Sequence, residues 1–294
     1  MPAAIATSGL TKRFGATVAL DDMTLTVEPG EVFGFLGPNG AGKTTTLRLL
    51  IGALHPTSGS ATVLGLDPWS DTVPLHRRVA YVPGEAAVWP NLTGRETLEL
   101  LGNMHGDVDT AYRDGLIERL RFDPSKKGRS YSKGNRQKIA LIAALMTRAE
   151  LLLLDEPTSG LDPLMEVTFR EEVVSAAGRG QTVFLSSHML SEVDALCTRV
   201  AILRAGRLVE TGSLGDLRHL RATVVDVEFA GAAPELAAVD GVEVVGRDGH
   251  RARYRVQGSV DGLLKALSQH PVRTLVSEEP SLEEIFLAYY GHDG

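Results

Sequence analysis

The chain has 294 residues and a formal net charge of −7, with 43% hydrophobic and 23% charged side chains. This length suggests two domains with a substantial core. The acidic balance argues against bulk affinity for nucleic acid or for an anionic lipid surface. The sequence has neither an apolar run near the ~20 residues that cross a bilayer nor a signal-peptide pattern, so we expect no membrane span and no secretion. The single cysteine, Cys197, excludes an internal disulfide and fits a packed thiol in a reducing cytosol.

The first 30 residues alternate apolar and polar side chains between turn signals, which predicts short antiparallel strands. An apolar run of strand type follows at residues 31–36, and residues 45–53 have a helical pattern. Apolar runs then alternate with helical patterns to about residue 220, which predicts a mostly parallel sheet flanked by helices. The predicted strands of this sheet are Val32–Leu36, Val79–Val82, Leu151–Leu154, Thr182–Leu185 and Val200–Leu203.

A complete phosphate-loop motif, G-x-x-x-x-G-K-[ST], lies between the first of these strands and the helix after it. Its glycines let successive backbone N–H groups turn toward a phosphate, and the helix N-terminus adds its positive dipole end. We expect Lys43 to reach the β- and γ-phosphates of a nucleotide and the Thr44 hydroxyl to ligate Mg²⁺. The residues predicted to bind nucleotide here are Gly37, Pro38, Asn39, Gly40, Ala41, Gly42, Lys43, Thr44 and Thr45.

A second anion site is predicted further along the chain. Residues 92–120 have a helical pattern with a capping box at its start, and could form an insertion that carries the next segment. That segment runs into an apolar helix at residues 139–146, with Ser132 and Gly134 at its N-terminus, where backbone N–H groups favour an anion. One phosphate loop and one separate site of this kind imply two copies, arranged head to tail, each closing the other's nucleotide site.

Two carboxylates follow the apolar strand Leu151–Leu154 directly. Asp155 would stand at the carboxyl end of the sheet, where α/β proteins bind ligands, and would hold Mg²⁺ through water. Glu156 is the natural candidate to polarise an attacking water, because phosphoryl transfer depends chiefly on positioning and electrostatic stabilisation. His188, after the strand Thr182–Leu185, could contact the γ-phosphate or that water.

A second unit is predicted from about residue 221 to residue 294. Its strand and helix order, βαββαβ, is the ferredoxin-like arrangement, with residues 246–249 as a hairpin turn. Residues 220–294 carry 12 acidic and 7 basic side chains, hence −5 of the total −7. An acidic unit suits packing against a neighbouring subunit better than binding nucleic acid. Its predicted elements are Thr223–Phe229, Pro234–Ala238, Val242–Val245, Ala252–Val256, Val260–Ser268, Val272–Val276 and a final helix Ser281–Tyr290.

Taken in order, GPNGAGKT, YSKGNRQ, LLLLDEP, SGLDP and SSH resemble the Walker A, signature, Walker B, D-loop and H-loop motifs of the ATP-binding cassette (ABC) family. The resemblance covers residues 1–220, with a helical subdomain at about 86–150. It implies an α/β phosphate-loop ATPase core with an antiparallel β subdomain, and ATP and Mg²⁺ as ligands. It also implies that Phe14 stacks on adenine and that Asp162 and the signature residues Ser132, Lys133 and Gly134 belong to the nucleotide site.

Two segments depart from the family pattern. The signature is usually L-S-G-G-Q, and here Lys133 replaces a glycine; a cation beside a γ-phosphate is electrostatically tolerable. At the Q-loop, Pro83 is followed by Gly84 and Glu85 rather than by the glutamine that helps hold Mg²⁺ or water in the family. Glu85 could serve as a magnesium ligand in its place, or the loop could be weakened, with slow or asymmetric hydrolysis.

The C-terminal residues 279–286 (EPSLEEIF) resemble the tail of drug-exporter ATPases of the daunorubicin-resistance type, whose membrane domain is a separate polypeptide. This resemblance implies an ATP-hydrolysing export subunit that pairs with a second ATP-binding subunit, as a homodimer or a heterodimer. A polytopic permease would hold the pair at the cytoplasmic face of the membrane. We expect the permease to dock near residues 89–104, where Trp89, Leu92, Leu98 and Leu101 are either anchors or core residues.

Two alternatives remain open from the sequence. A cassette ATPase without a membrane partner could act on ribosomes or DNA, although such relatives carry two cassettes with a basic linker or a long coiled coil, and the acidic tail disfavours RNA and DNA. A regulatory nucleotide-binding module with low turnover is suggested by Gly84, but Lys43, Asp155, Glu156 and His188 argue for catalysis.

Overall fold

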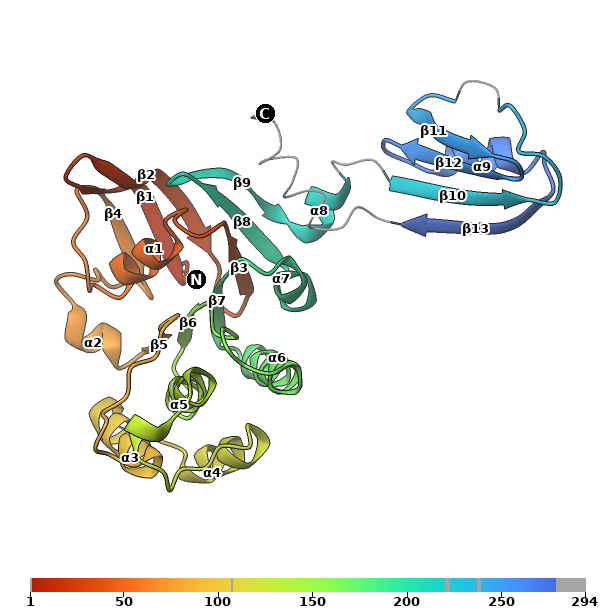
Figure 1. Cartoon of the computed structure of the whole chain (residues 1–294). Helices are drawn as coiled ribbons and strands as arrows, with labels where there is room; N and C mark the ends of the chain where they lie inside the picture. The colour runs from red at the N-terminus through yellow and green to blue at the C-terminus, as the bar shows by residue number, and fades with distance from the viewer. Residues whose placement is uncertain (1, 107, 220–222, 237–238, 279–294) are drawn as a thin grey trace. The chain divides into compact units, whose positions relative to one another are not determined.

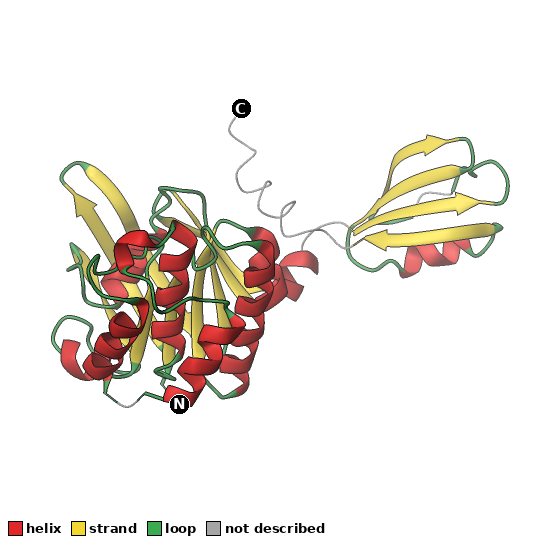
Figure 2. Ribbon diagram, turned by 60° about the horizontal axis from the view of Figure 1, so that its bottom comes forward, coloured by secondary structure: helices red, strands yellow, loops and turns green. Residues whose placement is uncertain are grey.

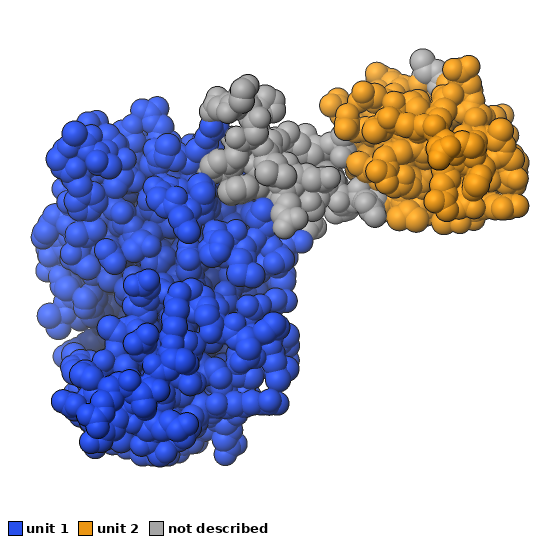
Figure 3. Space-filling model, viewed as in Figure 1, with its two compact units in different colours: residues 1–211 blue, residues 212–294 orange. Residues whose placement is uncertain are grey.

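The computed structural model describes residues 2–106, 108–219, 223–236 and 239–278. The chain separates into two compact units, residues 1–211 and 212–294 (Figure 3). The boundary predicted at 220/221 lies outside the described residues. Among the residues that are described, no helix combines the length and apolar character needed to cross a bilayer.

A six-stranded sheet forms the centre of the first unit (Figure 1), in the order β5-β6-β7-β3-β8-β9. The pairs from β5 through β8 are parallel, and β3, β6 and β7 are buried along their whole length, which explains their continuous apolar runs. All five strands predicted from these runs are confirmed. The strands are β3 Val32–Leu36, β5 Val79–Val82, β6 Leu151–Asp155, β7 Thr182–Ser187, β8 Arg199–Arg204 and β9 Arg207–Ser213.

A three-stranded sheet in the order β2-β1-β4 packs on the same core, and β1 pairs antiparallel with both of its neighbours, as predicted. Its strands are β1 Ile5–Phe14, β2 Thr17–Val27 and β4 Ser58–Val63. Leu10 and Leu20 of this sheet share one apolar cluster with Phe33 and Phe35 of the central sheet. This shared core holds the segment between β3 and the helix α1 (Lys43–Leu50) against both sheets. The short helix α2 (Thr72–His76) precedes β5.

The helical part of the first unit lies beyond the β5 end of the central sheet (Figure 1). The predicted capping box is confirmed, because Thr93 Oγ1 accepts from the Glu96 backbone N–H and the Glu96 carboxylate accepts from the Thr93 N–H. Residues 92–120 form two helices rather than a continuous one. The helices here are α3 Gly94–His105, α4 Thr110–Arg119, the 3₁₀ turn η1 Gly128–Ser130 and α5 Lys133–Leu145. Two more, α6 Pro163–Gly178 and α7 Leu190–Leu196, flank the sheet strands that follow.

The second unit begins with α8 (Leu214–His219) and contains a four-stranded sheet in the order β11-β12-β10-β13, with antiparallel pairs throughout. This is the strand order of the ferredoxin-like arrangement. One face packs on α9 (Asp261–Leu267), as Figure 2 shows, around Tyr254, Phe229 and Leu263. The strands are β10 Thr223–Phe229, β11 Val242–Asp248, β12 Arg251–Val256 and β13 Val272–Glu278.

Two predictions for this unit are wrong. The helix predicted at Pro234–Ala238 is absent from its described residues 234–236, which form an irregular connection; five residues are too few to sustain a helix without strong packing. The hairpin turn falls at Gly249 and His250 rather than at residues 246–249. An irregularity between Val244 and Gly246 lets β11 continue to Asp248, and Gly249 then takes the positive φ of the first central turn position. The predicted helix Ser281–Tyr290 lies outside the described residues.

Candidate active site

The phosphate loop connects β3 to α1 and opens onto a small pocket. Gly42 has a φ of 114°, and a Cβ there would lie 2.5 Å from the carbonyl oxygen of Ala19, so only glycine fits. The pocket has a volume of about 160 Å³. It is lined by Ala19, Pro38, Asn39, Gly40, Gly42, Lys43, Thr44, Thr45 and Glu156. The loop predicted from the motif therefore encloses a space together with a carboxylate that comes from β6.

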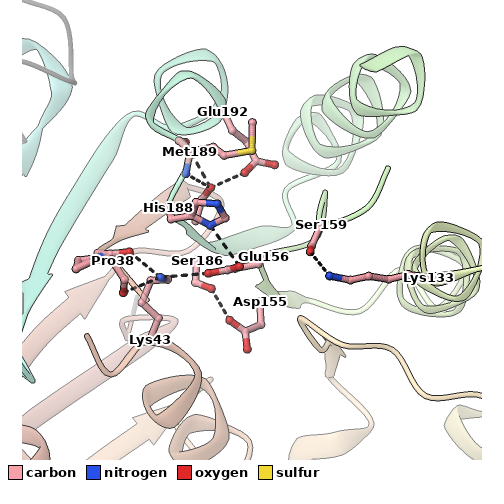
Figure 4. Close-up of polar contacts among 12 residues, drawn as sticks. Pro38, Lys43, Lys133, Asp155, Glu156, Ser159, Ser186, His188, Met189 and Glu192 are labelled. Atoms are coloured by element: carbon pink, nitrogen blue, oxygen red, sulfur yellow. Dashed lines mark hydrogen bonds and ion pairs between the residues drawn. The ribbon is translucent and has the colours of Figure 1, made fainter. Parts of the chain in front are cut away.

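The Lys43 ammonium is the charged group at the centre of this pocket. Its side chain is 4% exposed, and Nζ donates to the Gly37 carbonyl at 2.6 Å and to the Pro38 carbonyl at 3.2 Å. Glu156 Oε1 lies 3.2 Å from the same nitrogen (Figure 4). Because a buried charge must be compensated, these contacts fix the ammonium at the loop where an anionic phosphate would enter.

Glu156 stands between Lys43 and His188. Its Oε2 lies 3.3 Å from His188 Nδ1, and its backbone N–H donates to the Ser186 carbonyl at 3.0 Å. Glu156 has a φ of 46°, which is uncommon for a residue with a side chain. Backbone conformations of this kind concentrate at functional sites. The turn after β6 thus directs the carboxylate toward the Lys43 ammonium and the His188 imidazole (Figure 4).

Asp155 ends β6 and is 2% exposed. The Ser186 hydroxyl donates to its Oδ1 at 2.7 Å, because the two residues are partners in the β6–β7 register. In the part of the chain that is described, no group of three or more His, Cys, Asp or Glu side chains is arranged to hold a metal ion. Mg²⁺ needs no such cluster, since it binds through one or two protein oxygens together with phosphates and water. One carboxylate and the Thr44 hydroxyl are donors of that kind, so the residues fit Mg²⁺.

The residues of the predicted second anion site do not line this pocket, and Lys133 lies on α5, apart from Lys43 (Figure 4). Ser132 caps α5 by accepting from the Asn135 backbone N–H at 3.3 Å. Lys133 Nζ donates to Ser159 Oγ at 2.9 Å. Asp162 caps α6 by accepting from the Met165 N–H at 3.1 Å. The structure therefore does not bring Ser132, Lys133, Gly134 or Asp162 into the pocket of their own phosphate loop.

Two further predicted residues are exposed. Phe14, at the end of β1, is 49% exposed, and the Lys12 ammonium lies 5.0 Å from its ring centroid. A ring presented in this way can stack on a base, but it does not line the phosphate pocket. The Glu85 side chain is exposed, and it has no hydrogen bond or ion pair with any described residue.

The segment before Glu85 is anchored beside Asp155. Gln137 of α5 donates to the Pro83 carbonyl at 3.2 Å. A Cβ at Gly84 would lie 3.3 Å from the Asp155 carbonyl oxygen, so the chain passes close to that residue. Burial, and then the charge of Asp155, raises the pKa of Tyr81 to about 12, which keeps this phenol neutral.

Two family models and several known proteins are similar to this chain. A family model described as "ABC transporter" matches residues 20–159, and one described as "ATP-binding protein DrrA1-3-like, C-terminal domain" matches residues 212–290. The daunorubicin resistance ATP-binding protein DrrA3 of Streptomyces coeruleorubidus is 35% identical over 99% of this chain and 96% of its own.

The chain belongs to the ABC transporter ATP-binding proteins.

Two further comparisons support the assignment. The linearmycin resistance ATP-binding protein LnrL of Bacillus subtilis is 32% identical over 95% of this chain and 96% of its own. A solved structure titled as the ATP-binding subunit of an ABC transporter superposes with a TM-score of 0.69 and 30% identity, covering 73% of this chain and 92% of that one. A post-hydrolysis dimer of the cassette MJ0796, at 22% identity and a TM-score of 0.64, shares the fold.

This ABC protein is accordingly an ATP-binding subunit and an ATPase. Subunits of this family pair with one another and work with separate membrane permeases. Its Walker A lysine and the glutamate after Walker B form the ion pair described above.

Three supporting residues of this ABC protein were not predicted from the sequence. Ser186 orients Asp155, Gln137 anchors the Q-loop, and Ser187 bonds the N-cap of α7. The signal for Ser186 was a hydroxyl that interrupts an apolar strand at the level of Asp155. Gln137 lies inside the signature segment, but which residue it holds depends on tertiary packing.

Proposed function

We propose that this subunit hydrolyses ATP to drive the export of a drug, an antibiotic or another lipophilic compound through a separate permease at the cytoplasmic face of the cell membrane. The similarity to daunorubicin-resistance proteins across 99% of the chain, both units included, carries this proposal. Other relatives are named for bacitracin transport and linearmycin resistance.

Within the site, Lys43 would bind the β- and γ-phosphates and Glu156 would orient the attacking water. The two charged groups already share one pocket. An incoming phosphate would replace Glu156 as the ion-pair partner of Lys43, and the released carboxylate could then bind the attacking water. His188 would hold Glu156 or the γ-phosphate in position. Thr44 and Asp155 would hold Mg²⁺, with Glu85 as a further ligand, and the ion would neutralise charge that develops on the phosphates.

A second ATP-binding subunit would complete the site. None of Ser132, Lys133, Gly134 and Asp162 lines the pocket of their own phosphate loop, which favours a head-to-tail pair in which they contact the partner's nucleotide. Phe14 would stack on adenine at the outer end of each site. Each complete site would then contain the phosphate loop of one chain and the signature residues of the other.

A groove beside the Q-loop is the proposed permease surface. It has a volume of about 510 Å³ and lies among β5, α3 and α5, with Pro83, Val88, Trp89 and Met104 in its lining. Trp89 is 46% and Met104 is 73% exposed. Leu101 also lines the groove, whereas Leu98 is 1% exposed and is a core residue rather than an anchor. Because Pro83 adjoins Gly84, which lies against Asp155, a permease segment in this groove would be coupled to the magnesium site.

The second unit would support pairing. Its strand β13 stands at the edge of the sheet, where main-chain groups can pair with another strand, and Leu275 and Val276 are exposed on it. We therefore propose that residues 221–294 act as an accessory dimerisation domain, with β13 as the pairing strand.

The catalytic part is tested with Glu156→Gln. We expect the variant to bind ATP as the wild type does and to lose roughly 100-fold or more in kcat, because the amide cannot polarise water. Glu118→Gln, an exposed substitution on α4, is the matched control and should keep wild-type turnover. Equal turnover in Glu156→Gln and the control, with the permease present, would contradict the assignment.

The permease surface is tested with Met104→Glu. A charge in an apolar groove should abolish co-purification with the permease from detergent while ATP binding stays intact. Val73→Glu, which is equally exposed but lies on α2 outside the groove, should leave the complex intact. A complex that survives the groove charge would place the permease elsewhere.

A further inference from the structure

Glu192 is a buried carboxyl that none of the nucleotide contacts proposed above uses. It is the third residue of α7 and is 2% exposed. A carboxyl withdrawn from water needs a strong hydrogen-bond partner. That partner is the hydroxyl of Ser187, which donates to Glu192 Oε2 at 2.7 Å. Since Ser187 directly precedes His188, the buried carboxyl is tied to the turn that carries this histidine.

The same hydroxyl is also an acceptor. The backbone N–H of Met189, the N-cap of α7, donates to Ser187 Oγ at 2.9 Å, and no side chain caps the helix directly. In an ordinary capping box the glutamate at the third helical position accepts straight from the N-cap N–H. Here the serine hydroxyl bridges the Glu192 carboxylate and the Met189 N–H instead. The bond between the Met189 N–H and the Ser187 hydroxyl thus joins the two residues on either side of His188.

Glu192 faces polar and charged groups from three segments. Burial raises its pKa; the hydroxyls of Ser187 and of Thr158, in the loop after β6, lower it. On α6, Glu166 raises the pKa further and Arg170 lowers it. The Glu192 carboxyl therefore lies between the turn that carries His188 and the loop that follows Glu156. A substitution of Glu192 that altered the packing there would affect both segments.

We propose that Glu192 is a positioning residue for His188: its carboxyl fixes the Ser187 hydroxyl, which closes the 187–189 turn and holds the imidazole 3.3 Å from Glu156. The inference rests on the proposed role of His188 in hydrolysis. A purely structural role, in which Glu192 only stabilises the start of α7, makes a different prediction for a double-mutant cycle.

The cycle uses the full-length chain with Glu192→Leu, His188→Ala and the two substitutions combined. We expect Glu192→Leu to lower kcat roughly tenfold with the KM for ATP within about twofold, because the phosphate loop is untouched. In the His188→Ala background the same substitution should lower kcat by less than about twofold further, since the residue it acts through is already gone.

Two further variants distinguish loss of this interaction from misfolding. Glu192→Gln keeps an oxygen that can accept from Ser187, and it should retain at least about half of the wild-type kcat. Ser187→Ala removes the relay without touching Glu192 and should reproduce the loss and its dependence on His188. Additive losses in the double mutant, or a Glu192→Gln protein as impaired as Glu192→Leu, would overturn the inference. A His188→Ala protein with full activity would instead refute the proposed role of His188, and the inference with it.

Discussion

Lys133 and Ser159 join the start of α5 to the loop that follows Glu156. The Lys133 ammonium donates to the Ser159 hydroxyl at 2.9 Å, and the lysine stem lies beside Gly160. The bond is exposed to solvent, where such contacts add little to stability. An ammonium held this weakly can turn toward an anion. Lys133, which departs from the family signature, can thus contact either the Ser159 hydroxyl of its own chain or a phosphate of nucleotide bound to a partner chain.

Substitution of Lys133 separates these two roles. In a Glu156→Gln background, we expect Lys133→Met to weaken ATP-dependent pairing of two chains roughly tenfold, because a charge-assisted contact to phosphate is lost. Sedimentation equilibrium with ATP and Mg²⁺ measures the pairing constant. Ser159→Ala is the matched control: it removes only the intrachain partner and should leave pairing within about twofold. Equal weakening by both would show that the lysine acts through its own loop.

Gly134 is predicted to be indispensable for a steric reason. A Cβ at this position would lie 2.3 Å from the Gly160 carbonyl oxygen, so Gly134→Ala must push α5 away from the D-loop. We expect a loss of about 1–3 kcal/mol in the free energy of unfolding, with a matching fall in ATPase activity. Gly178→Ala is the control, because a Cβ added there in α6 would meet no heavy atom of the described residues within 4 Å, apart from the adjacent backbone of its own helix. That variant should be neutral or slightly stabilised in the same urea titration, and equal losses would contradict the steric argument.

The parts of the site that are contiguous in sequence could be predicted from it. Residues 37–45 read directly as a phosphate loop, and the apolar run before Asp155 fixed the end of β6. The bounds of β3 and β5 match the predicted ones, and the fully buried β6 and β7 extend one and two residues further, to Asp155 and Ser187.

Relationships set by tertiary packing could not be predicted. The Lys43–Glu156 pair joins the first residue of α1 to the residue that follows β6, and no spacing rule relates them. Leu98 was a candidate anchor because helical periodicity marks apolar residues without telling a core from an interface. In the second unit, the irregularity at Val244 lengthened β11 and moved the turn that the glycines at 246 and 249 had suggested.

Tyr254, at the centre of the second unit, carries a hydroxyl that has no hydrogen-bond partner in the described part of the chain, although the residue is 0% exposed. Tyr254→Phe should therefore leave the free energy of unfolding unchanged or raise it by up to about 1 kcal/mol. Tyr112→Phe is the contrasting control, because its hydroxyl donates to Glu172 at 2.6 Å. That variant should lose about 1–3 kcal/mol. Calorimetry of the full chain measures both, and destabilisation by Tyr254→Phe would reveal a partner for that hydroxyl.

Cys197 should be chemically inert in the folded protein. The residue is 7% exposed, and burial, followed by the charges of Glu192 and Glu31, raises the pKa of its thiol. Because the thiolate is the reacting species, a raised pKa lowers the reactive fraction at any pH below it. We expect alkylation by iodoacetamide at pH 8 to be about 100-fold slower in the native chain than in urea. A Ser60→Cys chain, with an added thiol on an exposed strand position, should take up one equivalent rapidly without urea. Similar native and urea rates at Cys197 would mean that α7 opens readily, and the fixed turn around His188 would then lose its support.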